Sequence, residues 1–173
     1  TGGNELVARL PDEWQFMLDP YDAGEWMELY SPKLTGGQWQ TLRTSSASWG
    51  DQGLYYYKGS AWYRCAVKVP ERFKGRRVML WFGAIDEAVK VWVNGKLITH
   101  QAERKNRDGT VTKETRDTLS GTWRPLEAEV TQAIRFGQDN AIVVKAINSR
   151  LNELGTGGIM KLVMLYSPGG PPR

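Results

Sequence analysis

The 173-residue sequence contains a single cysteine, a single histidine and no apolar run long enough to span a bilayer. Cys65 alone excludes an intrachain disulfide framework and leaves the redox compartment open. Because His100 is the only histidine, the chain also lacks the ligands of a His/Cys zinc cluster. We therefore expect no cofactor, and leave open only a structural calcium ion held by loop carboxylates and carbonyls.

Motifs of several enzyme classes are missing as well. The sequence has no Gly-x-Ser-x-Gly nucleophile elbow and no phosphate-binding loop. A catalytic thiol would need a base beside it, and Cys65 lies on the apolar side of an alternating run, which favours a buried structural thiol. Catalysis by this chain alone is not expected.

The net charge is +4, and most of the local excess lies between Arg104 and Arg116. A polar run of this kind is typical of a solvated loop, and no nucleic-acid motif accompanies it. We expect neither nucleic acid nor membrane as a partner. The basic run does predict a preference for acidic over neutral sugars if the chain binds sugar at all.

Strand signals dominate the centre of the sequence. Residues Ala61–Val69 alternate between apolar and polar side chains until Pro70, which cannot donate to a ladder. Arg77–Phe82 is a more continuous apolar run, and Val89–Val93 alternates again before Asn94-Gly95, a strong hairpin signal. Three consecutive antiparallel strands are predicted.

The same reading extends to both sides of this block, with no internal repeat and no long amphipathic helix. Further strands or short extended pieces are expected at Trp14–Leu18 (an edge strand), Met27–Tyr30, Trp39–Arg43, Lys96–His100, Leu126–Val130, Ala141–Ile147 and Ile159–Tyr166. Gln101–Thr122 is expected to be a long loop, and Thr131–Gly137 a helical turn. Strands without helices predict an all-β fold, an antiparallel two-sheet β-sandwich of the jelly-roll type.

The chain is long enough for one domain, residues 1–173, with a core at about 14–166. The ends, 1–5 and 167–173, are rich in glycine or proline and look like linkers. We expect a module excised from a larger, polysaccharide-active protein and, as part of that protein, a secreted or periplasmic location.

Strand direction predicts where the loops gather. If successive strands alternate in direction, the short connections fall at one end and the long polar and aromatic loops at the other, here called the top end. Binding residues concentrate on such loops, and aromatic rings with amides, carboxylates and arginine suit sugar hydroxyls and C–H faces. The predicted ligand-binding residues are Trp49, Asp51, Tyr55, Tyr57, Trp62, Asp86, Glu87, His100, Trp123, Arg124, Asn148, Arg150, Asn152 and Glu153.

Each of these residues also has a structural interpretation. The tryptophans can cap the core, the adjacent carboxylates can close a turn, the asparagines can form turns, and the histidine can stabilise a strand end. Eight tryptophans and seven tyrosines can equally fill the core of a sandwich.

Several segments in fixed order resemble a known family. WQFMLDP, GSAWYRCAVKVP, LWFGAIDEAVKVWVNGKLITH, EAEVTQAIRFGQDNAIVVKAIN and GTGGIMKLVMLY together resemble the N-terminal sugar-binding domain of family 2 glycoside hydrolases. The resemblance covers about Trp14 to Tyr166 and implies a galactose-binding-domain-like jelly roll. It departs from the family after His100, where QAERKNRDG stands in place of a Gly-Gly-aromatic stretch.

The resemblance implies a non-catalytic role, because the family's catalytic glutamates lie on a separate barrel domain. It also implies that the loops before Trp62 and between Asn148 and Gly158 reach toward that active site. Within this chain, Asp86 and Glu87 are adjacent, so their side chains diverge on an extended strand and do not form the facing pair that glycoside hydrolysis needs.

Three functions remain open from the sequence. The favoured one is a carbohydrate-binding module that reads a sugar at the top end. The alternatives are an accessory domain that packs on a covalently linked catalytic barrel without binding sugar alone, and a protein–protein interaction module.

Overall fold

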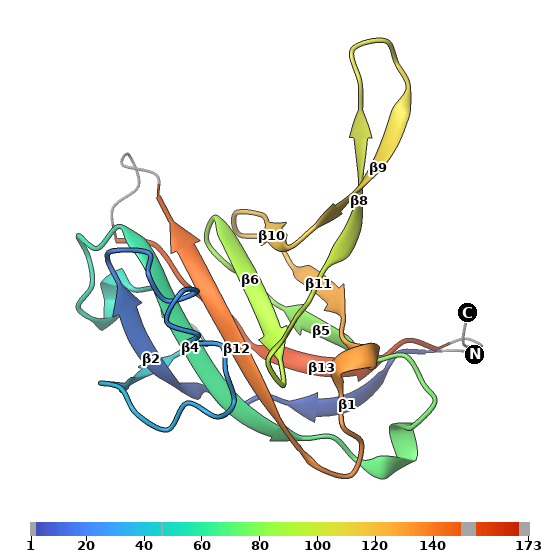
Figure 1. Ribbon diagram of the computed structural model, residues 1–173, viewed down its shortest axis with the longest axis horizontal. Helices are drawn as coiled ribbons and strands as arrows, with labels where there is room; N and C mark the ends of the chain where they lie inside the picture. Colours follow the sequence, from blue (N-terminus) through green and yellow to red (C-terminus); the bar gives the residue numbers. More distant parts are fainter. Residues whose placement is uncertain (1–2, 46, 150–154, 170–173) are drawn as a thin grey trace.

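The computed structural model describes residues 3–45, 47–149 and 155–169 and is an antiparallel β-sandwich of the jelly-roll type (Figure 1). The smaller sheet has the strand order β1 (Glu5–Arg9), β13 (Val163–Ser167), β5 (Met79–Phe82) and β11 (Leu126–Glu129). The larger sheet has the order β10 (Thr118–Ser120), β6 (Ala88–Val93), β12 (Asp139–Asn148), β4 (Gly59–Lys68), β2 (Glu13–Asp19) and β3 (Gln40–Arg43), with β7 (Lys96–Leu97) paired to β6.

Three short 3-10 turns lie in the connections: η1 (Gly50–Gln52), η2 (Glu71–Phe73) and η3 (Thr131–Ala133). The last lies within the predicted helical turn Thr131–Gly137, whose final residue Gly137 has a φ of +74°. Among the described residues no helix is both long and apolar enough to cross a membrane.

The core lies between the two sheets and follows from the alternation along the strands. On β4, Tyr63 and Val67 face inward and are buried, while Ala66 and Lys68 face outward. Aromatic rings fill much of the volume: Phe16 of β2 contacts Tyr63 edge to face, with ring centroids 4.9 Å apart. Such pairs contribute beyond their buried area, which explains part of the high aromatic content.

The strand assignments differ from the sequence predictions at three places. Strand β2 is not an edge strand, because it pairs with β4 on one side and with β3 on the other. Strand β1, which pairs with β13, was not predicted, since only Val7 of its five residues is buried. Met27–Tyr30 forms turns and not an extended piece.

The predicted long loop Gln101–Thr122 is also wrong in its structure. It contains the hairpin of β8 (His100–Lys105) and β9 (Val111–Arg116), followed by β10. The hairpin projects from the sandwich (Figure 1), and most of its side chains are exposed. A strand that faces solvent on both sides needs no apolar alternation, so the pattern that identifies half-buried strands is missing here.

The loop between β2 and β3 packs on the outer face of the large sheet. There, a second apolar cluster forms around Trp62 and Trp92, whose ring centroids are 5.1 Å apart. Tyr30 of the loop stacks on Trp92 with an interplanar angle of 8°. The large sheet is therefore buried on its inner face by the other sheet and on part of its outer face by residues 20–39.

Candidate functional site

The loops that strand direction assigns to the top end do meet there. The register places Gly59 beside Asn148 and Ala88 beside Ile147, so β4, β12 and β6 share one end. Backbone hydrogen bonds then connect the loops: the Gly155 amide donates to the Tyr55 carbonyl at 2.9 Å. The Asp86 amide donates to the Gly158 carbonyl and the Gly121 amide to the Glu87 carbonyl, both at 3.0 Å, so described residues of four connections meet at the top end.

Two of the predicted aromatic residues do not belong to this surface. Trp49 is fully buried and donates from Nε1 to the hydroxyl of Tyr63 at 2.6 Å. Trp62 is fully buried under the β2–β3 loop, on the outer face of the large sheet. Neither ring offers a face to a sugar, which corrects the prediction for both; the alternative, that these tryptophans fill the protein interior, describes them.

Asp86 and Asn148 are buried as well. The Asn148 amide donates to the Thr156 carbonyl at 3.4 Å and accepts from Lys58 Nζ at 3.5 Å, so it holds the top-end loops together. Both carboxylate oxygens of Asp86 lack a hydrogen-bond partner within the part of the chain that the structure describes. The side chain that the sequence placed at a binding surface is instead an isolated polar group in the interior.

The remaining candidates reach the surface to different degrees. Glu87 accepts from the amide and the hydroxyl of Ser149, and Asp51 binds Ser48. The Tyr57 hydroxyl donates to the Ser60 carbonyl at 2.6 Å. Half or more of Tyr55 and Trp123 is exposed, Arg124 is exposed, and His100 begins the β8–β9 hairpin. Arg150, Asn152 and Glu153 lie outside the described residues.

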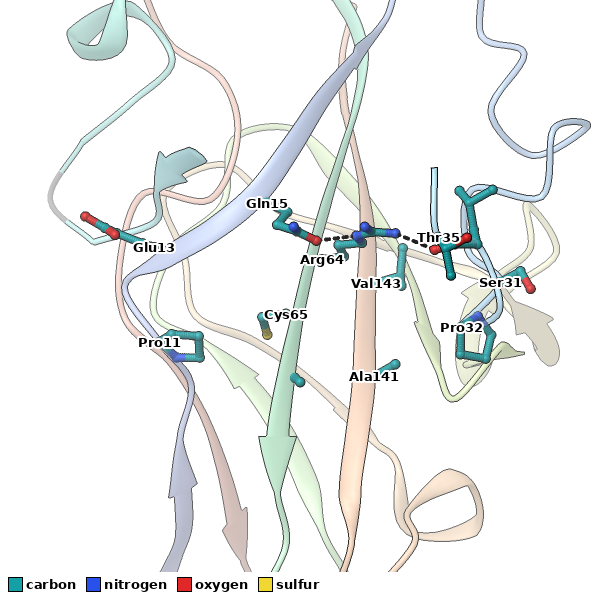
Figure 2. A pocket seen from close by; sticks show the side chains of 12 residues that line it. Pro11, Glu13, Gln15, Ser31, Pro32, Thr35, Arg64, Cys65, Ala141 and Val143 are labelled. Carbon is teal, nitrogen blue, oxygen red and sulfur yellow. Dashed lines mark hydrogen bonds between the residues drawn. The ribbon is translucent and has the colours of Figure 1, made fainter. Parts of the chain in front are cut away.

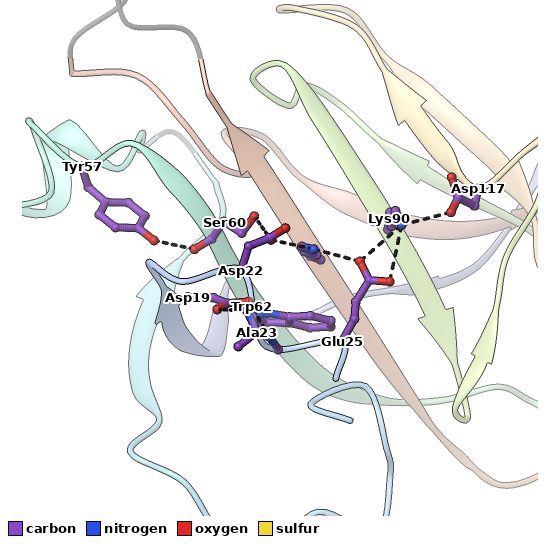
Figure 3. A network of polar contacts seen from close by, with 11 residues as sticks. Asp19, Asp22, Ala23, Glu25, Tyr57, Ser60, Trp62, Lys90 and Asp117 are labelled. Atoms are coloured by element: carbon purple, nitrogen blue, oxygen red, sulfur yellow. Dashed lines mark hydrogen bonds and ion pairs between the residues drawn. The ribbon is translucent and has the colours of Figure 1, made fainter. Parts of the chain in front are cut away.

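The structure contains a polar network on the outer face of the large sheet that the sequence did not predict (Figure 3). At its centre the Lys145 ammonium lies 2.8 Å from both Asp22 and Glu25, although its side chain is almost entirely buried. Lys90, on the next strand, forms ion pairs with Glu25 and Asp117. The network fixes the covering loop across β12 and β6.

The ion pairs set the pKa values of this network. The contact with Lys145 lowers the pKa of Asp22, and the contact with Lys90 lowers that of Asp117. Burial alone would raise the pKa of Glu25, but the two lysines outweigh it and the pKa is lowered. For Lys145, burial acts downward, and its two carboxylate partners reverse the effect and raise the pKa. All these groups are charged at neutral pH.

No metal-ligand cluster of three or more His, Cys, Asp or Glu side chains occurs among residues 3–45, 47–149 and 155–169. The candidates that reach the surface include tyrosine, tryptophan, arginine, histidine and carboxylate side chains. Such groups can stack against and hydrogen-bond a ligand.

The curated proteins that the chain resembles include a β-galactosidase and β-glucuronidases. Over 94 residues the chain is 29% identical to a β-galactosidase from Thermoanaerobacter pseudethanolicus, and over 144 residues it is 26% identical to a β-glucuronidase from Paenibacillus borealis. These alignments cover 54% and 80% of this chain but only 10% and 20% of the relatives. No protein-family model matches the chain.

Solved structures agree on the fold. A β-glucuronidase from Ruminococcus gnavus in complex with D-glucuronic acid superimposes with a TM-score of 0.75 at 20% identity, and another structure of that organism's enzyme with a TM-score of 0.76 at 19% identity. The chain is covered to 97% in both cases and spans 30% and 29% of those chains. The chain resembles the N-terminal sugar-binding domain of family 2 glycoside hydrolases.

Sequence reasoning missed the outer face of this family 2-like sandwich. The outward positions of β4 carry Arg64 and Lys68, which is typical of a solvent-exposed face, and the sequence predicted only a short extended piece at Met27–Tyr30 in the loop that covers this face, where the structure has turns. The sequence did offer one signal of a covered outer face: two large aromatic residues, Trp62 and Trp92, occupy outward positions of their strands. An aromatic residue at an outward position indicates that something covers it.

Proposed function

We propose that this chain is the accessory sandwich domain of a family 2-type β-glycosidase, which packs against a catalytic domain and performs no catalysis itself. Support comes from the coverage: nearly the whole chain aligns with less than a third of each β-glucuronidase structure. A domain that occupies part of a larger enzyme has a surface made to be covered.

The observation that carries the proposal is a group of exposed apolar side chains on the β2–β3 loop. Trp26 is 88% exposed and Tyr21 is 91% exposed, and Met27 beside them is more than half exposed. The loop itself is fixed by the Asp22–Lys145 and Glu25–Lys145 ion pairs. Large apolar side chains held out on an anchored loop are typical of a contact surface.

The experiment is oxidative footprinting of Trp26 and Met27 in this chain and in the full-length protein from which it derives. We expect both side chains to be oxidised readily in the 173-residue chain and protected several-fold in the longer protein, because the catalytic domain covers them. Val111, exposed on the β8–β9 hairpin, is the internal control for general reactivity.

Two results would overturn the proposal. One is a full-length protein that encodes no catalytic domain. The other is equal oxidation of Trp26 in the two proteins. Hydrolysis of 4-nitrophenyl β-glucuronide or β-galactoside by the purified chain would contradict the non-catalytic role.

Sugar binding at the top end is a second candidate function. It is favoured by the side chains of Tyr55, Tyr56 and Trp123, which are at least half exposed, and by the exposed Arg124 nearby in sequence. A glycan array probed with the chain and with Trp123→Ala tests it. Binding that is weakened about tenfold or more by the substitution supports this site, and binding that does not change excludes it.

A further inference from the structure

The outer face of the large sheet holds a pocket of about 540 Å³ beside the covering loop (Figure 2). Its floor includes Ala66 of β4 and Ala141 of β12, which are paired in register. Two small side chains side by side leave the sheet surface bare, while Pro11 and Pro32 border the hollow. The volume lies within the range of about 300–1,000 Å³ that is typical of small-molecule sites.

A single arginine is fixed at one side of this pocket. Arg64 pairs with Gln15 across the sheet, and its Nε donates to the Gln15 side-chain oxygen at 2.5 Å. Its Nη1 donates to the Leu34 carbonyl at 3.0 Å (Figure 2). The guanidinium carbon also lies 4.1 Å from the ring centroid of Trp39. Three contacts, one from β2 and two from the covering loop, hold the guanidinium in one orientation.

The charge of Arg64 is not neutralised by an ion pair in the part of the chain that the structure describes. Within the described residues the side chain forms no ion pair, and the two hydrogen bonds use two of the five N–H donors of a guanidinium. Burial partly removes the guanidinium from water, which lowers the pKa of Arg64. An oriented, partly desolvated guanidinium is suited to receive a carboxylate.

The other polar side chains of the pocket limit the chemical class of ligand that it can bind. Gln15 and the exposed Glu13 line the same pocket, as do Ser31 and Thr35. The Glu13 carboxylate disfavours a ligand with several negative charges, but it accepts hydrogen bonds from hydroxyl groups. One cation, one carboxylate and an amide around an apolar floor fit a ligand with one carboxylate, several hydroxyls and an apolar C–H face.

We propose that this pocket binds an acidic saccharide, with the carboxylate of a uronic acid on Arg64 and its hydroxyls on Gln15 and Glu13. The site lies away from the top end and does not require docking to a catalytic domain. It therefore goes beyond the proposed function, and either proposal can fail without the other.

Calorimetric or NMR titration of the 173-residue chain tests the proposal. The probes are glucuronate and a glucuronate-containing disaccharide, with glucose as the neutral analogue and acetate as the bare carboxylate. We expect glucuronate to bind about tenfold or more tightly than glucose and acetate, and more weakly as salt is added. Absence of glucuronate binding, or equal affinity for glucose, would overturn the proposal.

Two variants locate the binding. Arg64→Gln removes the cation, and Ala66→Leu fills the floor while leaving every hydrogen bond of Arg64 in place. Each is expected to weaken glucuronate binding about tenfold or more. Because Arg64 also holds the covering loop, Ala66→Leu is the test that does not depend on that loop, and urea unfolding checks that both variants fold.

Lys68→Gln is the matched control, since it removes a positive charge from the same face of β4 outside the pocket. It should change the affinity less than twofold, as should Trp123→Ala at the top end. Equal losses of glucuronate affinity in Lys68→Gln and Arg64→Gln would mean that general charge attraction causes the binding. Unchanged affinity in Ala66→Leu would mean that glucuronate binds outside this pocket. Either outcome overturns the proposal.

Discussion

The indole Nε1 of Trp62 donates a hydrogen bond to Asp19 Oδ2 at 2.9 Å, which joins the centre of the large sheet to the start of the covering loop (Figure 3). Asp19 also accepts from the backbone amides of Ala23 and Gly24, both at 2.8 Å. One buried carboxylate thus fixes the loop backbone and an aromatic side chain together. The exposed Trp26 and the Lys145 network both depend on this geometry.

Gly24 is expected to tolerate no side chain. A Cβ at this position would overlap the Trp62 indole and lie 2.7 Å from Asp19 Oδ2. Gly24→Ala should therefore lower the free energy of unfolding by about 1–3 kcal/mol, measured by urea denaturation. Gly36→Ala is the control, because a Cβ there meets nothing within 4 Å, and it should change the stability by less than about 0.5 kcal/mol. Equal effects would mean that the close contact with Trp62 is not present in solution.

Lys145 is expected to contribute more to the free energy of unfolding than a surface lysine does. Its removal in Lys145→Met leaves Asp22 and Glu25 without their nearest cation, and the stability at pH 7 should fall by about 1–3 kcal/mol. Lys96→Met, at an exposed position of β7, is the control and should have little effect.

The same network predicts acid lability. The pKa values of Asp22, Glu25 and Asp117 are lowered in the folded protein, so their contribution to stability is complete above the unfolded pKa values of about 4 and is lost as the pH falls below them. The free energy of unfolding should decrease from about pH 5 downward, and less steeply in Lys145→Met. A slope that is the same in this variant and the parent chain would show that other carboxylates control acid unfolding.

The sandwich could be predicted from the sequence because its strands bury one face. The alternation that includes Tyr63, Val67 and Val69 therefore identifies a strand and its buried side. Sequence reasoning recovered the convergence of the top-end loops for the same reason, since strand direction alone sorts the connections. It could not distinguish a buried aromatic from an exposed one: Trp62 and Trp123 look alike in sequence, and their burial depends on whether a distant loop covers them. Nor could it find the Arg64 pocket, which arises from two alanines on different strands.

Asp86 is expected to reduce the stability of the domain. Its buried carboxylate has no hydrogen-bond partner in the described part of the chain, and the free energy of an unsatisfied buried polar group is about 1–3 kcal/mol unfavourable. Asp86→Ala should therefore stabilise the chain or leave the stability unchanged, whereas most substitutions of buried residues destabilise. Asn148→Ala is the contrasting variant, since that buried amide is hydrogen-bonded and its loss should destabilise. Destabilisation by Asp86→Ala would show that the carboxylate has a partner that these contacts do not include.

The β8–β9 hairpin should be dispensable for folding. Its two strands pair only with each other, and two-stranded hairpins contribute little on their own. Replacement of residues 103–113 by Asn-Gly joins Ala102 and Glu114, which face each other in the register, through a turn suited to two residues. We expect the free energy of unfolding to change by less than about 1 kcal/mol and glucuronate binding to be unaffected, because the Arg64 pocket contains no hairpin residue. A loss of more than about 2 kcal/mol would mean that the hairpin folds back onto the sandwich in solution, and a loss of glucuronate affinity would assign the binding to its basic side chains.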